Sequence, residues 1–294
     1  MNSNSLHSPN SRPLTKNSQR SLSNSVSELG EFLRTASKMV VITGAGISSG
    51  SGIPTYRDDN GNWKSSRPIQ HGEFMRTHSV RQRYWARSYS GWPTINEAAP
   101  NHAHAALAKL EAKGVVRGLV TQNVDRLHQR AGHKRVIDLH GRLDQVLCMD
   151  CGAISTRAEV QQWLQENNPQ LSEGVGLTRP DGDADVDDSL VDTVNVPNCE
   201  RCAGLLKPNV VFYGSSVEKS IVSDIYEKIE LSDAVLIVGS SLTVFSSFRF
   251  CKFAHEKGIP LLCINQGLTR ADDLYKIKVA EPCGKALQTL EAIL

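Results

Sequence analysis

Short apolar runs rich in β-branched residues recur along the chain and predict the strands of one sheet. The first run, Lys38 to Thr43, ends directly before a glycine. The later runs are Val115 to Thr121, Val210 to Tyr213, Ala234 to Gly239, Ile259 to Asn265 and Lys276 to Val279. Continuous apolar runs of this length are typical of parallel strands that are buried on both faces.

Helical patterns lie between many of these runs. They cover His102 to Lys113, Val124 to Ala131, Val217 to Leu231, Ser246 to Lys257 and Gly284 to Leu294. Strands that alternate with helices predict an α/β fold, a Rossmann-like and mostly parallel sheet with helices on both faces. In such a sheet, ligands bind outside the carboxyl ends of the strands.

Two stretches interrupt this alternation and predict a smaller module inserted into the sheet domain. Residues 56–91 carry aromatic residues and arginines in a helical pattern, and residues 142–207 carry four cysteines and an acidic segment. The Rossmann-like domain then comprises residues 28–55, 92–141 and 208–294, and the two insertions form a zinc-binding and helical module.

The first 27 residues are rich in serine and asparagine and contain no acidic residue. We interpret this segment as a disordered tail, because it has too few apolar residues to offset the entropy of ordering. Its composition also resembles a mitochondrial presequence. The lack of an apolar helical face favours a nonspecific tail and a cytoplasmic protein, with the mitochondrial matrix as the alternative.

The charge balance and the hydropathy exclude two classes of partner. Lys and Arg total 33 against 31 Asp and Glu, a net charge of +2, which is too even for a protein that mainly binds nucleic acid. The longest apolar run is far shorter than the roughly 18 residues of a membrane span. The sequence leaves the oligomeric state open, and a monomer is compatible with it.

Four of the seven cysteines form two C-x-x-C pairs, Cys148 with Cys151 and Cys199 with Cys202. Two such pairs supply the four thiolates of a closed tetrahedral zinc site, which has no open position for a substrate. Redox thiols and disulfides are the alternatives. A redox pair would open a helix after a strand, however, whereas these pairs lie among turn residues. We therefore expect one structural Zn²⁺.

Aspartates at alternate positions from Asp181 to Asp187 superficially resemble a calcium loop. Val186 stands where that loop needs glycine, and Asp192 stands where it needs glutamate. A solvated acidic segment is the better interpretation.

A glycine-rich stretch, Gly44 to Pro54, follows the first predicted strand. Glycines between a strand and a helix allow the backbone to approach a pyrophosphate. The G-x-G-x-x-G fingerprint of dehydrogenases fails, because Ser49 occupies its third glycine position. On its own, the stretch indicates either a phosphate-binding loop or an ordinary turn.

Together with other motifs, this stretch resembles the sirtuin family over about residues 30 to 294. The motifs occur in the family's order. They are GAGISSGSGIPTYRD from Gly44, QNVD from Gln122, LHG from Leu139, the two C-x-x-C pairs, KPNVVFYG from Lys207, VGSS from Val238 and INQ from Ile264. The stretch Arg81 to Pro93 is most similar to class II sirtuins, the group of mitochondrial sirtuin 4 and bacterial relatives.

The resemblance implies an NAD-dependent protein lysine deacylase. Such an enzyme transfers the acyl group of an acylated lysine to ADP-ribose and releases nicotinamide. A protein mono-ADP-ribosyltransferase that uses the same NAD site is the alternative. By resemblance, His140 is the general base, and Asn123 and Asp125 hold the nicotinamide amide. From the residues alone, Asn123 and Asp125 would equally suit a helix cap.

The resemblance also assigns the binding residues. The cofactor residues are Gly44, Ala45, Gly46, Ser48, Tyr56, Arg57, Gln122, Asn123, Asp125, Gly239, Ser240, Ser241, Asn265, Gln266 and Cys283. The substrate residues are Val211, Phe212, Tyr213 and Gly214, where a peptide would add as an extended strand.

Three features depart from the family pattern or qualify it. Thr55 and Tyr56 replace the usual Asp and Phe, and Ser215 stands where the family often has Glu. Tyr84 and Arg87 form a Tyr-x-x-Arg pair, which in desuccinylating sirtuins recognises an acidic acyl group. Packing of the helix is the alternative role for this pair.

Overall fold

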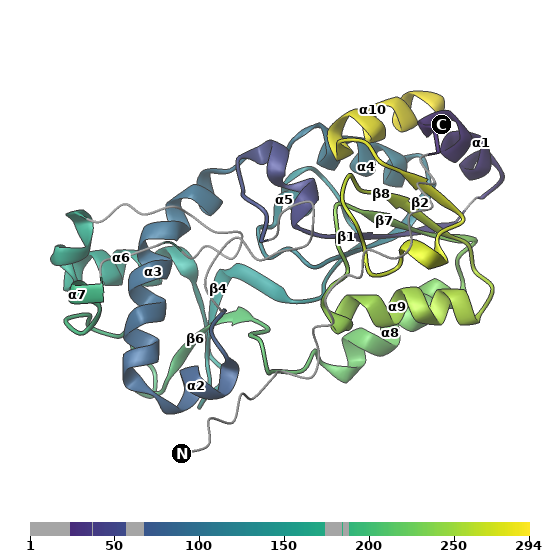
Figure 1. Ribbon diagram of the computed structural model, residues 1–294. Coiled ribbons are helices and arrows are strands. Elements are labelled where there is room, and N and C mark those ends of the chain that lie inside the picture. Colours follow the sequence, from purple (N-terminus) through teal and green to yellow (C-terminus); the bar gives the residue numbers. More distant parts are fainter. Residues whose placement is uncertain (1–23, 37, 57–67, 174–183, 185–187) are drawn as a thin grey trace, which may run out of the picture.

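The computed structural model describes residues 24–36, 38–56, 68–173, 184 and 188–294 (Figure 1). Most of the predicted tail, Arg57 and most of the acidic segment lie outside these residues. The predictions for them, including the location of the protein in the cell, therefore stay predictions.

Six parallel strands form the central sheet in the order β3-β2-β1-β7-β8-β9. They are β1 (Met39–Thr43), β2 (Val116–Thr121), β3 (Val136–Asp138), β7 (Ala234–Val238), β8 (Leu261–Ile264) and β9 (Ile277–Val279). The chain progresses outward from β1 in one direction and from β7 in the other. The topological switch point, where such sheets bind ligands, therefore lies between the carboxyl ends of β1 and β7.

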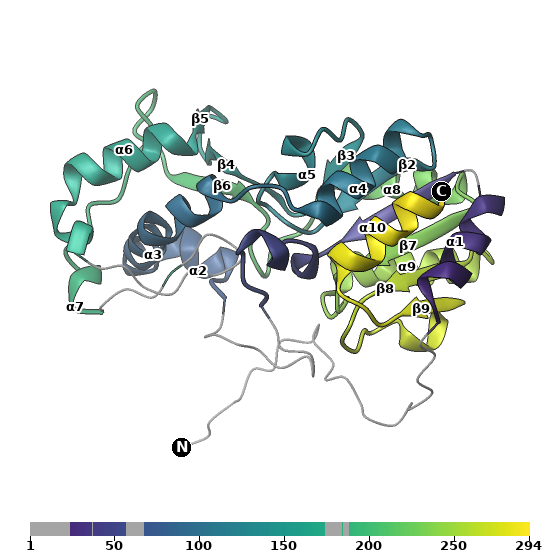
Figure 2. The same cartoon turned by 90° about the horizontal axis from the view of Figure 1, so that it is seen from above.

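Helices cover both faces of this sheet (Figures 1 and 2). One face carries α1 (Val26–Thr35), α4 (His102–Ala112) and α10 (Cys283–Ile293), and the other carries α8 (Lys219–Glu230) and α9 (Phe245–Glu256). Met39 and Val41 pack into the first apolar core, and Val40 and Ile42 into the second. Successive residues of a strand point to opposite faces, so the uninterrupted apolar run of β1 serves both cores. The prediction of a parallel sheet with helices on both faces is confirmed.

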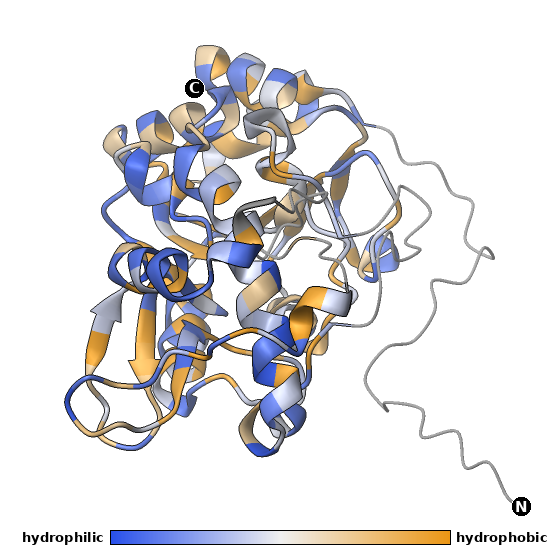
Figure 3. Ribbon diagram, turned by 90° about the vertical axis from the view of Figure 1, so that its left-hand side faces the viewer, coloured by the Kyte–Doolittle hydropathy of each residue, from blue (hydrophilic) through white to orange (hydrophobic). Residues whose placement is uncertain are grey.

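A smaller module stands beside the sheet domain (Figure 1). It contains the antiparallel strands β4 (Gly141–Cys148), β5 (Ile154–Thr156) and β6 (Leu206–Val210), in the order β5-β4-β6. Its helices are α2 (His71–Arg76), α3 (His78–Glu97), α6 (Arg157–Asn167) and α7 (Asp188–Val191). The short helix α5 (Leu127–Arg130) follows β2. Blue and orange bands alternate along many of the helices, as expected where one helix face is buried (Figure 3).

The 3₁₀ turns complete the fold. They are η1 (Ala45–Ile47), η2 (Ser49–Ser51), η3 (Pro169–Glu173) and η4 (Asp272–Leu274). Among the described residues, no helix combines the length and hydropathy that crossing a membrane would require.

The prediction that Val210 to Tyr213 forms a strand of the parallel sheet is wrong. The strand at this place is β6, Leu206–Val210, and it pairs antiparallel with β4 in the small sheet. A short apolar run indicates a strand but not the sheet to which it belongs. The sixth place in the parallel sheet belongs to β3, which the pattern missed because it is three residues long and only half-buried.

Several elements cross the predicted boundaries. α3 continues past residue 91 to Glu97, and β6 spans the boundary between residues 207 and 208. α1 begins at Val26, inside the predicted tail. Ser25 and Glu28 form a capping box there, a local signal that fixes the start of this helix.

Candidate active site

A cavity of about 1310 Å³ lies at the carboxyl ends of β1 and β7 and extends between the two modules. The loops after β1, β2 and β7 line its floor, and α3 and the segment after β6 line its other side. It is larger than the roughly 300–1,000 Å³ of a pocket for one small ligand. The space therefore suits two ligands that meet, such as a dinucleotide and a peptide side chain.

The glycine-rich loop lies directly against the loop that follows β7. The N–H of Gly46 donates to the carbonyl oxygen of Gly239 at 2.8 Å. A Cβ on Gly46 would lie 2.8 Å from that same oxygen, and Gly239 itself has a φ of +59°. Glycines are needed here because the two loops approach each other more closely than side chains allow. Of the two interpretations of this stretch, the geometry favours a ligand-binding loop over an ordinary turn.

Most of the predicted cofactor residues line this one cavity. They are Gly44, Ala45, Gly46, Tyr56, Gln122, Asn123, Gly239, Ser240, Ser241, Asn265, Gln266 and Cys283. Cys283 also begins α10, whose free N–H groups and dipole favour an anion at that end of the cavity. Ser48 and Asp125 do not line the cavity but lie directly behind it, both buried.

Asn123, Ser48 and Asp125 form a hydrogen-bonded chain below the cavity floor. Nδ2 of Asn123 donates to the Ser48 hydroxyl at 3.0 Å and to the carbonyl oxygen of Gly44 at 3.2 Å. The Ser48 hydroxyl donates to Asp125 Oδ2 at 2.7 Å. Within the described residues, the side-chain oxygen of Asn123 has no such partner, so it can accept a hydrogen bond from a ligand amide.

Asp125 therefore orients Asn123 through Ser48. Burial raises the pKa of Asp125, and the hydrogen bonds from Leu127 N–H and the Ser48 hydroxyl oppose this rise. The predicted contact of Asp125 with nicotinamide stays a prediction, and in this structure Asp125 is connected to Asn123 through Ser48.

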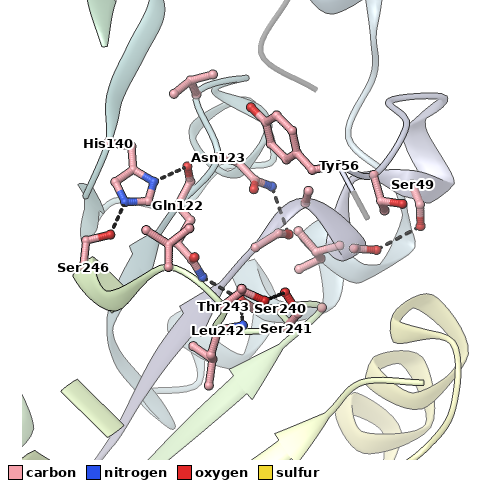
Figure 4. Close-up of a pocket in the computed structure, with 18 of the residues that line it drawn as sticks. Ser49, Tyr56, Gln122, Asn123, His140, Ser240, Ser241, Leu242, Thr243 and Ser246 are labelled. Carbon is pink, nitrogen blue, oxygen red and sulfur yellow. Dashed lines mark hydrogen bonds between the residues drawn. The ribbon is translucent and has the colours of Figure 1, made fainter. Parts of the chain in front are cut away.

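His140 is half-buried in the cavity wall, directly before the first residue of β4 (Figure 4). Its Nδ1 lies 3.1 Å from the carbonyl oxygen of Gln122, and its Nε2 lies 2.8 Å from the Ser246 hydroxyl. Burial lowers the pKa of His140 to about 4, and the Arg249 charge contributes to this, whereas the Gln122 carbonyl opposes it. The imidazole is thus neutral at pH 7 and can accept a proton.

The conformation of Gly141, next to His140, explains the Leu-His-Gly motif. Gly141 has a φ of +81°, and a Cβ there would lie 2.9 Å from the Cα of Val210. The glycine allows β4 to begin against β6 and so aims the preceding histidine into the cavity.

The predicted substrate residues, Val211 to Gly214, also line the cavity. Part of their backbone is already paired. The N–H of Val211 donates to the His140 carbonyl oxygen, and the Tyr213 carbonyl oxygen accepts from His71 N–H, both at 2.8 Å. A peptide that adds here would use the remaining backbone groups of this stretch.

Tyr84 and Arg87 do not face the cavity together. Tyr84 lines it, packed edge-on against Phe74 and Phe212 with ring centroids 5.4 Å apart in each pair. Arg87 is absent from the lining, and its Nε donates to the Ala184 carbonyl oxygen at 3.1 Å.

The four cysteines of the two C-x-x-C pairs converge at one end of the small module. Their sulfur atoms all lie within 4.8 Å of one another, with 3.6 Å between Cys148 and Cys202 and 3.8 Å between Cys151 and Cys199. All four are free thiols, so the disulfide interpretation is wrong. Tetrahedral Zn²⁺ with Zn–S bonds of about 2.3 Å places its sulfurs at this spacing, so the residues fit the ion.

The pKa values of Cys148 and Cys202 also favour a bound cation. Backbone N–H groups, that of Cys151 first, lower the pKa of Cys148 to about 7, while the neighbouring thiols raise the pKa of Cys202 to about 12. A cation would allow all four to ionise together.

Three polar residues that line the cavity were not among the predicted site residues. They are Thr243, Ser246 and Arg249, of which Ser246 contacts His140 and Thr243 contacts Ser241. All three lie shortly after the predicted Gly239–Ser241 loop, Thr243 just before α9 and the other two in its first turns. Their closeness in sequence to this predicted loop was the signal that could have identified them.

Comparisons with known proteins agree with this geometry. Residues 44–246 match the model of the Sir2 family. An NAD-dependent protein deacetylase 2 of Bradyrhizobium diazoefficiens is 49% identical over 262 residues, 89% of this chain and 96% of the relative. The NAD-dependent protein lipoamidase sirtuin-4, mitochondrial, of Bos taurus is 44% identical over 269 residues, 90% of this chain and 85% of the relative.

Solved structures of Sir2 enzymes share the fold. A Sir2 with a p53 peptide and NAD⁺ superimposes with a TM-score of 0.73 at 27% identity, covering 92% of this chain and 98% of that one. A Sir2 bound to a propionylated peptide gives 0.71 at 27% identity, covering 91% and 97%.

Proposed function

This chain belongs to the Sir2 family, and we propose that its cavity joins NAD to an acylated lysine beside His140. The protein is an NAD-dependent protein deacylase that passes the acyl group to ADP-ribose and releases nicotinamide. The observation that carries the proposal is the single cavity, which brings Asn123, His140 and the Val211–Gly214 stretch together from distant parts of the chain.

NAD would lie along the carboxyl ends of β1, β7 and β8. Asn265, Gln266 and Cys283 line the side that suits adenosine, and the glycine-rich loop with Ser240 and Ser241 lines the middle, where the phosphates would lie. The N-terminus of α10 adds a favourable field for the pyrophosphate. Asn123 would then accept a hydrogen bond from the nicotinamide amide at the far end.

His140 would act after nicotinamide has left. Cleavage of the glycosidic bond places positive charge on the ribose, and the acyl oxygen of the lysine bonds to the anomeric carbon. A ribose hydroxyl then attacks the carbon of the acyl-imidate and must lose its proton. The neutral imidazole of His140 supplies the acceptor, because its tautomer places the lone pair on Nε2.

The acyl-lysine would enter between the two modules, beside the Val211–Gly214 stretch. Relatives of known structure hold peptides, one of them propionylated. On this side the apolar residues of the lining are Pro68, Ile69, Tyr84, Val124, Val210 and Phe212, and Gln70 follows Ile69 in the lining.

We propose that neutral acyl groups are preferred over acidic ones. In the part of the chain that the structure describes, the lysines and arginines of the cavity lining are Arg249 and Lys285. Lys285 belongs to α10 at the cofactor end, Arg249 lies beside His140, and Arg87 is directed to Ala184. Among the described residues of this wall, no lysine or arginine would pair with a carboxylate carried by the acyl chain, and burying an unpaired carboxylate is costly.

One peptide sequence, prepared with acetyl-, propionyl-, lipoyl- or succinyl-lysine, tests both the deacylase function and the preference for neutral acyl groups. After incubation with NAD, mass spectrometry should show loss of the acyl mass without a gain of ADP-ribose, with the succinyl peptide slowest. A gain of ADP-ribose without loss of acyl mass would establish the transferase alternative. Preferred removal of succinyl would contradict the apolar acyl site while leaving the deacylase assignment intact.

A further inference from the structure

Both ring nitrogens of His140 are engaged in this structure (Figure 4). A carbonyl oxygen only accepts hydrogen bonds, so the contact with Gln122 O places the ring proton on Nδ1. Nε2 then carries the lone pair, and the Ser246 hydroxyl donates to it at 2.8 Å. The lone pair that the base needs is already occupied by a serine.

Ser246 therefore stands at the nitrogen where His140 would take up the proton. A sugar hydroxyl has two routes to His140. It can displace the serine and give its proton directly to Nε2, or it can pass its proton to Nε2 through the serine hydroxyl. Ser246 itself lines the cavity, and a hydroxyl can accept one hydrogen bond while donating another. The arrangement is that of a relay.

Contacts at the start of α9 hold this arrangement in place. Arg249 Nε donates to the Ser246 carbonyl oxygen at 3.0 Å. The neighbouring Ser247, fully buried, donates to Gln122 Oε1 at 2.9 Å. Gln122 thus fixes His140 through its backbone and α9 through its side chain, so the imidazole and Ser246 keep a constant spacing.

We propose that Ser246 is a further catalytic residue that relays the ribose proton to His140. The O–H bond of the ribose breaks as its oxygen bonds to the acyl-imidate carbon, and the π electron pair of the C=N bond moves to the nitrogen. The released proton goes to Ser246 Oγ, and the hydroxyl proton of Ser246 goes to His140 Nε2. The serine ends neutral and unchanged, and His140 ends as imidazolium. The proposal rests on the deacylase function proposed above.

The test uses two reactions of the same full-length enzyme. Deacylation of an acetyl-lysine peptide requires the ribose proton to leave. Exchange of labelled nicotinamide into NAD, in the presence of the same peptide, reports the earlier cleavage of the glycosidic bond and its reversal. A relay affects the first reaction and spares the second.

Ser246→Ala should lower the kcat of deacylation by roughly 10- to 100-fold, at or below the lower limit of the roughly 10²–10⁴-fold that general acid–base groups contribute, because His140 itself is retained. Nicotinamide exchange and the KM for NAD should stay within about twofold of the parent protein. Ser246→Thr keeps a hydroxyl and should recover most of the lost kcat. Ser232→Ala, whose hydroxyl bonds only to Ile229 O among the described residues, is the control and should change neither reaction.

Three results would overturn the relay. Unchanged deacylation in Ser246→Ala would show that His140 takes the proton directly. An equal fall of deacylation and exchange, or no recovery in Ser246→Thr, would show that Ser246 only shapes the cavity. If the parent protein itself shows no NAD-dependent deacylation, the proposed function fails instead, independently of Ser246.

Discussion

The two ends of the molecule bring distant residues together by different physical means. At the carboxyl ends of the parallel strands, Gln122, Asn123 and His140 are neutral and hydrogen-bonded within the protein, and two apolar cores support them. In the four-cysteine cluster, four sulfurs lie within 4.8 Å of one another, and the neighbouring thiols raise the pKa of Cys202 to about 12. The cavity at the carboxyl ends of the strands, the sheet end, is stabilised by the packing of the protein. The four-cysteine cluster requires a bound cation.

This difference predicts where the protein is most vulnerable. Loss of the ion should unfold the small module first and remove the wall that Val211–Gly214 and α3 give to the cavity. A change at the sheet end should weaken ligand binding while the module keeps its ion.

Removal of one thiolate should have the largest effect. Cys199→Ala leaves three ligands in the cluster, and structural zinc contributes roughly 10–16 kcal/mol to the folding of small zinc domains. We expect loss of the bound zinc and of nearly all deacylase activity, measured by metal analysis and by peptide turnover.

Cys251→Ala is the matched control for this loss. Cys251 is a buried core residue of the sheet domain, outside the cysteine cluster. This variant should lose some stability but keep one zinc per chain. Retention of full activity by a zinc-free Cys199→Ala protein would contradict the dependence of the small module on the ion.

A Cβ at the close approach of the two glycine loops should have an intermediate effect. Gly46→Ala places a carbon 2.8 Å from Gly239 O, so the loops must separate. We expect a loss of about 1–3 kcal/mol in the free energy of unfolding, typical of overpacking, together with a higher KM for NAD and unchanged zinc content.

Gly118→Ala tests whether that effect is specific. Its Cβ would meet Lys228 Cδ at 3.6 Å, an ordinary contact, and Gly118 lies in β2 away from the cavity. Chemical denaturation and NAD kinetics of the two variants should differ. Equal losses would show that the sheet is generally intolerant of alanine and that the loop approach has no special role.

A change of pH between 5 and 7 should have the smallest effect on the rate of deacylation. Since burial lowers the pKa of His140 to about 4, the base stays unprotonated down to about pH 5. Deacylation should be insensitive to this group between pH 5 and 7 and should fall as the pH approaches 4. An ordinary exposed histidine would give a fall near pH 6.5.

The same shift affects stability with a defined sign. The unfolded chain binds a proton to this histidine below about pH 6.5, whereas the folded chain does so only below about pH 4. Its contribution to stability is therefore present above pH 6.5 and is lost as the pH falls through this window. His104, whose pKa burial also lowers to about 4, acts in the same direction. Zinc content measured in parallel separates this loss from release of the ion.

Much of the sheet domain could be predicted from the sequence, because its strands are buried on both faces and its helices separate them. β1 and β7 are continuous apolar runs, and their positions were evident from this pattern. The place of β6 could not be predicted, because pairing depends on partners distant in sequence. Leu206–Val210 joins β4 through contacts that a five-residue pattern does not encode.

Site residues could be predicted where a local sequence motif marks them. His140 and the cysteines were visible because their spacing or neighbours are distinctive. Ser246 was not, since a serine at a helix start is ordinary and its partner His140 is 106 positions away in the sequence.

The central claim is that one cavity couples cleavage of the glycosidic bond of NAD to removal of the acyl group through His140. His140→Ala tests it most directly when deacylation and nicotinamide exchange are measured on the same preparation. We expect deacylation to fall by roughly 10²–10⁴-fold, the usual contribution of a general base, while exchange persists. Deacylation at the rate of the parent protein would show that His140 does not take part in removal of the acyl group.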